Sequence, residues 1–218
     1  VDKDTVVPMI KGMSPSNNSI IGKNTIIKIA AIDNNRLSNI VVEYKTDDVW
    51  STLSKIEVFS SEYFGEIKWN TDNLNEKKYI IRAYAIDKAG NRSEYREAVY
   101  TIDNKNPQKA ELTAESGNYK ININIGDTSD TDIAKYGIYR KKLNQDDSAY
   151  KKIYTTTKHK YVDEDVITNT MYSYKVKIYD KVGNTTITDA VKSYAKNIDN
   201  IKPTASLSKV MTGIEGME

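Results

Sequence analysis

Aspartate is the residue whose placement most clearly suggests a chemistry in this sequence. Acidic side chains recur in short linkers that end in proline, in loops between hydrophobic segments, and in Asp-Lys-x-Gly-Asn turns. Carboxylate and carbonyl oxygens are the ligands that calcium prefers, in sets of six to eight. Because linker, loop and turn would meet at one end of a β-sandwich, these acids are candidate ligands for two calcium sites. Their residues would be Asp2, Asp4, Asp33 and Asp87 for the first, and Asp103, Asp130, Asp132 and Asp180 for the second.

The same residues also have a purely structural interpretation. Asp and Asn side chains cap their own backbone in turns, and Gly90-Asn91 and Gly183-Asn184 are typical of hairpin turns. The sequence therefore leaves two hypotheses open, which are calcium at one or both module junctions and plain turn chemistry.

Catalytic chemistry has few candidate residues. His159 is the single histidine and there is no cysteine, so imidazole bases are limited to one position and thiolate nucleophiles are absent. No G-x-S-x-G, P-loop or G-x-G-x-x-G motif is present. Acid clusters such as Asp163-Glu164-Asp165 are interpreted as solvated loop residues. The sequence predicts a protein that is not an enzyme.

Charge and hydropathy exclude two further classes. Lys plus Arg (32) nearly cancel Asp plus Glu (30), which argues against a nucleic-acid partner. The longest apolar run, Ile29 to Ile32, has four residues, so no membrane insertion and no signal peptide is expected within this segment.

An internal repeat defines the domain organisation. The linker that ends in Pro107 resembles those that end in Pro8 and Pro203, and these prolines are 99 and 96 residues apart. Each Asp-Lys-x-Gly-Asn turn follows a tyrosine by eight residues, Tyr79 and Tyr172. A period of about 95 residues is the size of an immunoglobulin-like sandwich. The expected boundaries are 1–103 for the first module, 104–199 for the second, and 200–218 for the start of a third module or a tail.

Hydrophobic alternation with a period of two predicts strands rather than helices. The rows expected to face the cores are Ile27, Ile29, Ala31; Ile40, Val42, Tyr44; Tyr79, Ile81, Ala83, Ala85; Ile121, Ile123, Ile125; Tyr136, Ile138; and Tyr172, Tyr174, Val176, Ile178. The predicted fold class is all-β, with two tandem immunoglobulin-like or fibronectin type III β-sandwiches arranged end to end.

Residues 107–198 resemble a bacterial fibronectin type III module. The resemblance rests on the segments 132–140, 161–163, 172–176 and 180–184. It implies that Tyr172 hydrogen-bonds back to the preceding turn as a tyrosine corner. The first module resembles the Ig-like repeats of bacterial surface proteins, through Asp33-Asn34-Asn35, Trp50, Trp69 and the turn at Asp87. The linkers are similar to those of cadherins, whose junctions hold calcium.

These resemblances imply a function without catalysis. Such modules serve as spacers or adhesive units in extracellular proteins of Gram-positive bacteria, so a secreted or cell-wall-associated location is expected. The expected role is a structural spacer whose partners are neighbouring modules of the same chain. The alternative is an adhesin or glycan-binding module, with a surface protein or a glycan as partner, because sixteen tyrosines could supply an aromatic platform.

Overall fold

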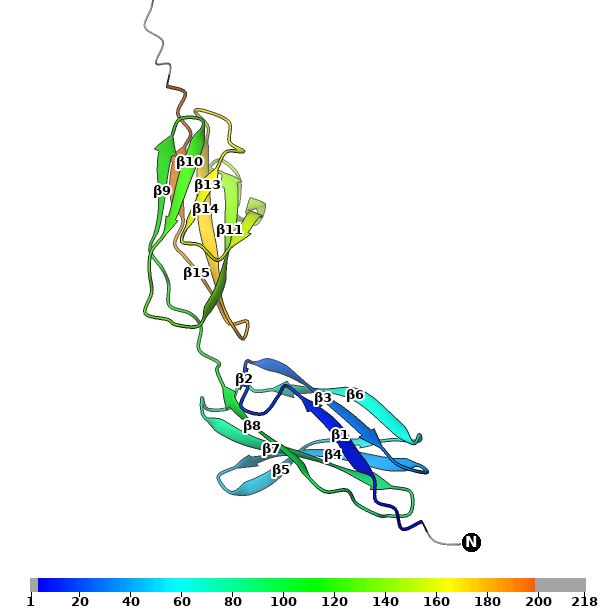
Figure 1. Ribbon diagram of the computed structural model, residues 1–218. Coiled ribbons are helices and arrows are strands. Elements are labelled where there is room, and N and C mark those ends of the chain that lie inside the picture. The colour runs from blue at the N-terminus through cyan, green and yellow to red at the C-terminus, as the bar shows by residue number, and fades with distance from the viewer. Residues whose placement is uncertain (1–3, 199–218) are drawn as a thin grey trace, which may run out of the picture.

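The computed structural model describes residues 4–198 as two β-sandwiches joined by a short linker. Asp2 and residues 200–218, the expected start of a third module or a tail, lie outside the described residues. The first hydrophobic core runs from Ile10 to Ile102, and the second from Ala110 to Ala195. The two modules follow one another with their long axes inclined (Figure 1). No helix in the described part of the chain is long and apolar enough to cross a membrane.

The first module packs a three-stranded sheet against a five-stranded sheet. Their strand orders are β1-β3-β6 and β2-β8-β7-β4-β5. The strands are β1 (Met9–Ser14), β2 (Ile20–Ile21), β3 (Asn24–Ile32), β4 (Leu37–Thr46), β5 (Val49–Glu57), β6 (Glu62–Asn70), β7 (Lys78–Asp87) and β8 (Arg96–Ile102).

The second module repeats this plan. One sheet has the order β13-β10-β9, and the other has β12-β11-β14-β15, with β16 also paired to β14. Its elements are β9 (Leu112–Gly117), β10 (Lys120–Ile125), β11 (Ile133–Lys142), the 3-10 helix η1 (Asp147–Ala149), β12 (Lys151–Thr156), β13 (Lys160–Asp163), β14 (Met171–Asp180), β15 (Thr185–Ile187) and β16 (Val191–Tyr194). The predicted all-β fold of tandem sandwiches is confirmed.

The alternating hydrophobic residues of the sequence lie on the buried face of each sheet. Along β7 and β14, alternate side chains are buried, from Tyr79 to Ala85 and from Tyr172 to Ile178. Every row expected to face a core does so, with Tyr44 partly buried and the other members buried. The strand phase read from the sequence is therefore confirmed in both modules.

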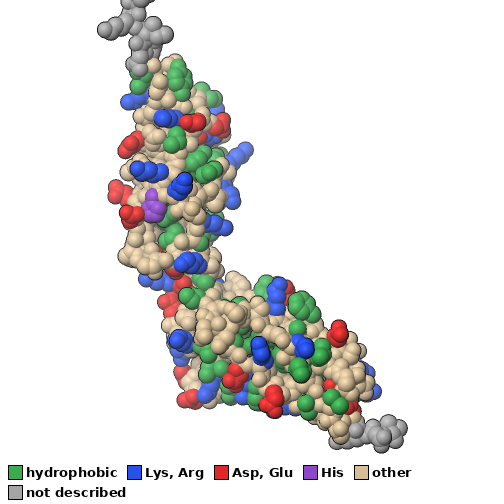
Figure 2. All heavy atoms as spheres, viewed as in Figure 1, with side chains coloured by type: hydrophobic (Ala, Val, Ile, Leu, Met, Phe, Trp, Pro, Cys, Tyr) green, Lys and Arg blue, Asp and Glu red, His purple; other side chains and the backbone are tan. Residues whose placement is uncertain are grey.

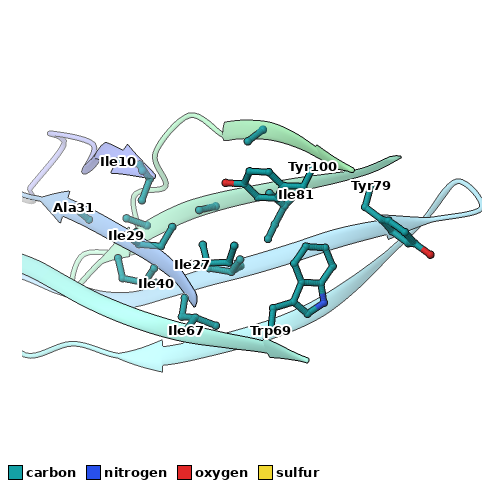
Figure 3. Close-up of a cluster of buried hydrophobic side chains, with 14 of the residues drawn as sticks. Ile10, Ile27, Ile29, Ala31, Ile40, Ile67, Trp69, Tyr79, Ile81 and Tyr100 are labelled. Atoms are coloured by element: carbon teal, nitrogen blue, oxygen red, sulfur yellow. The ribbon is translucent and has the colours of Figure 1, made fainter. Parts of the chain in front are cut away.

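Trp69 is the largest side chain in the core of the first module. It is 2% exposed and lies between two tyrosines, with ring centroids 5.4 Å from Tyr44 and 6.2 Å from Tyr79. Figure 3 shows Trp69 beside Ile27 and Ile67, with the Tyr79 hydroxyl pointing away from the other labelled side chains. Tyr79 is thus held by aromatic packing at one end of the core.

The first module has one feature that the repeat did not predict. The short strand β2 pairs with β8 in parallel, at Ile20–Thr101 and Ile21–Ile102. The hydroxyl of the fully buried Tyr100 donates a 2.6 Å hydrogen bond to the Pro15 carbonyl in the loop before β2. Burial raises the pKa of Tyr100 to about 12, so this donor keeps its proton.

The second core contains an ion pair that the sequence interpretation missed. Asp163, at the end of β13, is fully buried rather than solvated, which corrects the loop interpretation of this acid. Its carboxylate accepts hydrogen bonds from Arg140 at 2.8 and 2.9 Å and from the Tyr174 hydroxyl at 2.7 Å. Burial and this bond raise the pKa of Tyr174, so its hydroxyl stays a donor.

Tyr172 ties β14 to the turn that precedes it. Its hydroxyl accepts a 3.0 Å hydrogen bond from the Ile167 N–H. We expect Tyr172→Phe to lower the free energy of unfolding of the second module by about 1 kcal/mol, because it leaves a part-buried N–H unpaired. Tyr139 lies beside Tyr179 over Gly137, outside the core, and Tyr139→Phe should be nearly silent. Denaturant titration of both variants checks this, and equal losses would contradict it.

Candidate functional site at the module entrances

The linker between the modules is fixed at both ends by hydrogen bonds. On the side of the first module, the Asp103 N–H donates to the Ile21 carbonyl at 2.9 Å, and Asn104 Nδ2 donates to the Thr71 carbonyl at 2.7 Å. On the side of the second module, Asn184 Nδ2 donates to the Asp103 carbonyl at 2.9 Å. Asp103 is therefore held by both modules.

A close contact between backbones supports this junction. Gly22 follows β2 of the first module and faces Val182 in the turn after β14. A Cβ added at Gly22 would lie 2.8 Å from the Val182 carbonyl oxygen, closer than such atoms pack. The absence of a side chain at Gly22 thus allows the modules to approach at this point.

Asp180 organises the turn that reaches the junction. Its Oδ1 accepts the N–H groups of Val182, Gly183 and Asn184 at 2.9, 2.6 and 2.8 Å, and Gly183 has φ +97°. This is the turn chemistry expected from Asp-Lys-x-Gly-Asn. The residue is only 4% exposed, and its Oδ2 is buried without a hydrogen-bond partner in the described structure. One oxygen of Asp180 therefore builds the turn while the other is left free.

Three carboxylates converge at the junction. Asp103, Asp132 and Asp180 each offer one oxygen, and these oxygens lie within 4.8 Å of one another. The three residues line a cavity of about 370 Å³, and acidic side chains are visible at the waist between the modules (Figure 2). Burial raises the pKa of the Asp103 carboxyl, and the charges of Asp180, Asp132 and Glu76 raise it further, against a hydrogen bond from the Lys105 N–H.

Two other acids of this loop lie outside the converging set. Asp130, expected among the ligands, lines the same cavity, but its Oδ2 accepts the Gln108 N–H. Asp127 instead pairs with His159, with 2.9 Å between its Oδ1 and the histidine Nδ1. Spacing alone did not distinguish these acids from Asp132, because all of them belong to the same loop.

A second set of carboxylates forms the entrance of the first module. Asp4, Asp33 and Asp87 also bring one oxygen each within 4.8 Å of the others. Asn91 Nδ2 donates to the Asp4 carbonyl at 3.0 Å, which repeats the bond from Asn184 to Asp103. The linker and turn positions of the two sets therefore correspond.

The loop carboxylates of the two sets do not correspond. In the strand register, Leu37 pairs with Asp87 and Ile133 pairs with Asp180. Asp132 directly precedes Ile133, whereas Asp33 lies four residues before Leu37. The two entrances thus reach a similar arrangement from different loop positions.

His159 is placed by structural contacts. Its Nε2 lies 3.0 Å from the Tyr136 hydroxyl, and the two rings pack edge to face with centroids 5.2 Å apart. With Asp127 on its other nitrogen, the imidazole lies between a surface carboxylate and a core tyrosine. Neither of these two ring partners, Tyr136 and Asp127, is a serine that could act as a nucleophile.

The raised pKa of Asp103 predicts how the stability of the metal-free protein depends on pH. Its folded pKa lies above 3.8, so in the window above that value the folded state binds more protons than the unfolded state. The contribution of Asp103 to stability should therefore rise as pH falls from neutral toward 3.8, opposite to a carboxyl whose pKa is lowered on folding. Denaturant titration in EDTA should show this trend as the difference between wild type and Asp103→Asn. A difference that does not change with pH would contradict it.

Comparison with solved structures identifies the fold. The chain superposes on the FN1–FN3 domains of chicken CNTN1 with a TM-score of 0.60 and 14% identity, covering 87% of this chain and 66% of that one. Fibronectin(III)-like modules of Clostridium thermocellum CbhA give 0.52 and 18%, covering 91% and 100%. Domains A168–A170 of titin give 0.53 and 10%, covering 88% and 66%.

These likenesses show tandem fibronectin III-like sandwiches. The chain spans just under two thirds of the length of the CNTN1 and titin fragments. Neither a protein family nor a curated protein matches the sequence.

Proposed function

We propose that this chain is a non-catalytic spacer segment of a modular extracellular protein, at the bacterial cell surface or secreted. The observation that carries this proposal is the junction, where both modules fix Asp103 and the backbones at Gly22 and Val182 meet. A linker held in this way sets the direction in which the second module leaves the first. A freely jointed pair would have no need of these contacts.

The architecture suits a mechanical role. The ten-residue strands β7 and β14 would each extend roughly 33 Å at 3.3 Å per residue. Modules stacked end to end hold their neighbours apart by a set distance. The similar solved structures are also fragments of consecutive modules. The extracellular setting is an inference from the resemblance to modules of bacterial surface proteins.

A glycine substitution tests the spacer proposal. Gly22→Leu should push the turn at Val182 away, because its Cβ alone would lie 2.8 Å from the Val182 oxygen. We expect small-angle scattering of this variant to show a changed maximum dimension or a more flexible pair. Gly12→Leu is the matched control, since nothing lies within 4 Å of a Cβ there. Identical scattering from wild type and both variants would mean that the junction does not set the arrangement.

A glycan-binding or adhesive role is the second candidate. Tyr154 and Tyr161 stack at 4.6 Å with 20° between their rings, beside a groove of about 760 Å³. Tyr154 is half-exposed, and three lysines line the groove, Lys135, Lys158 and Lys160. Aromatic rings next to hydrogen-bond donors are what a sugar platform requires. On the face shown in Figure 2, however, hydrophobic side chains lie in small groups between charged ones.

Glycan-array binding separates the two candidates. Saturable binding by wild type that is lost in Tyr154→Ala and kept in Tyr119→Ala would favour the adhesive role. Tyr119 is the matched control because it is similarly exposed and lies in the turn between β9 and β10. The spacer proposal expects no saturable binding.

A further inference from the structure

We propose that Asp103, Asp132 and Asp180 form a calcium site that locks the orientation of the two modules. This inference goes beyond the spacer role, because it names a ligand for the junction and a condition that controls its stiffness. It rests on the geometry of the three carboxylates, on an unpartnered buried oxygen, and on the module to which each ligand belongs.

The separation of the oxygens fits a calcium ion. Calcium takes oxygen ligands at about 2.3–2.6 Å, so two ligands on opposite sides of the ion lie roughly 4.6–5.2 Å apart. The three carboxylate oxygens lie within 4.8 Å of one another, so one ion can reach all three. Carbonyl groups and water would complete the six to eight ligands that calcium takes.

Asp180 supplies the independent observation. The residue is only 4% exposed, yet its buried Oδ2 has no hydrogen-bond partner in the described structure. A carboxylate oxygen that is removed from water without a partner is unfavourable. The turn satisfies Oδ1 with three N–H groups and leaves Oδ2 without a partner, and the Asp180 carboxylate has an oxygen within 4.8 Å of oxygens of the other two carboxylates. A cation among the three oxygens would provide the missing partner.

Charge repulsion points to the same ligand. Asp103, Asp132 and Asp180 bring three carboxylate oxygens within 4.8 Å of one another, and like charges at this distance repel. Side chains that repel one another would move apart unless the backbone held them. Here the backbone bonds of Asp103 and the turn of Asp180 hold them together. A divalent cation would turn this repulsion into attraction.

The proposed ligands come from both modules, so a bound ion would affect how the modules are held together. Asp103 follows β8 directly, and its N–H is bonded to the Ile21 carbonyl of the first module. Asp132 directly precedes β11 and Asp180 is the last residue of β14, and these two strands of the second module are paired. An ion bound to all three would connect the modules directly. Removing it would leave the linker bonds to oppose the repulsion alone.

The entrance of the first module does not support the same inference. Both oxygens of Asp87 accept hydrogen bonds from Asn91, at 2.7 Å each. Asp33 has an unpartnered Oδ1, but its side chain is only partly buried. The proposal is therefore confined to the junction.

Calcium titration tests the proposal on the whole chain. Metal-free protein is titrated with CaCl₂ in a calorimeter, and its thermal unfolding is compared in calcium and in EDTA. We expect a dissociation constant on the order of 10⁻⁴ to 10⁻³ M, as for extracellular modules, and a rise of several degrees in melting temperature at about ten times that concentration. Asp103→Asn and Asp180→Asn should each weaken binding about tenfold or more. Asp146→Asn is the matched control, because it removes the same charge from an exposed position.

Each result decides the matter. Calcium binding that is lost in Asp103→Asn and kept in Asp146→Asn supports the site. No calcium-dependent heat or melting shift in wild type would overturn it, and so would binding that is unchanged in Asp103→Asn. If Asp180→Asn does not fold, Asp103→Asn still tests calcium binding, because Asp103 lies on the linker and not in the core of either module. A negative result would leave the metal-free contacts of Gly22 and Asn184 in place, so it is distinguishable from failure of the spacer proposal.

Discussion

Replacing Asp163 with alanine is expected to lower the free energy of unfolding of the second module by about 3–5 kcal/mol. Asp163 is fully buried, and Arg140 and the Tyr174 hydroxyl donate to its carboxylate. Without it, the Arg140 guanidinium would remain in a largely buried place without its main partner, and the Tyr174 hydroxyl would lose its acceptor. The loss of one partner of such a pair costs more than the pair itself contributes.

The two tryptophans make this effect measurable in the intact chain. Trp50 and Trp69 both lie in the first module, so tryptophan fluorescence follows that module, while circular dichroism follows both. Asp163→Ala should shift the transition seen by circular dichroism and leave the fluorescence transition in place. Asp146→Ala should change neither by more than about 0.5 kcal/mol, as for an exposed position. A loss below about 1 kcal/mol for Asp163→Ala would contradict the buried network.

Replacing Trp69 with alanine should lower the free energy of unfolding of the first module by about 3–5 kcal/mol. The indole is 2% exposed and packs between Tyr44 and Tyr79, so its removal leaves a cavity that two flanking rings cannot easily fill. Part of the loss comes from the aromatic pairs themselves.

Phe64 provides the matched control on the same strand. It lies five residues before Trp69 on β6, so the two side chains project from opposite faces, and Phe64 is 75% exposed. Phe64→Ala should change stability by no more than about 0.5 kcal/mol. Denaturant titration monitored by tryptophan fluorescence measures both variants, with Trp50 as the remaining fluorophore in Trp69→Ala. Similar losses from Phe64→Ala and Trp69→Ala would mean that the face assignment of β6 is wrong.

Much of the fold could be predicted because its signals are local. Alternation along β7 and β14 set their buried faces, and the repeated Asp-Lys-x-Gly-Asn turn marked the end of each strand. Asp180 was expected to approach Asp103 because linker, loop and turn meet at one end of a sandwich. In the structure these two residues and Asp132 converge.

The features that were missed depend on distant contacts. Asp163 has the same sequence surroundings as a loop acid. Its burial depends on partners distant in the sequence, Arg140 on β11, 23 residues away, and Tyr174 on β14. Asp130 and Asp132 are two residues apart, but the pairing of Ile133 with Asp180 brings the neighbouring Asp132, and not Asp130, into the converging set. The parallel pairing of β2 with β8 joins segments about 80 residues apart and leaves no periodic signal.

The distance between the two modules tests most directly whether they are held in one orientation. The chain has no cysteine, so spin labels can be placed on Lys55→Cys in β5 and Lys151→Cys in β12, both exposed and on different modules. Pulsed electron paramagnetic resonance then gives the distribution of distances between the labels. The fixed junction predicts a single narrow distribution, sharper in calcium than in EDTA if the proposed ion binds. A broad distribution under both conditions, as expected of a flexible linker, would contradict a fixed spacer.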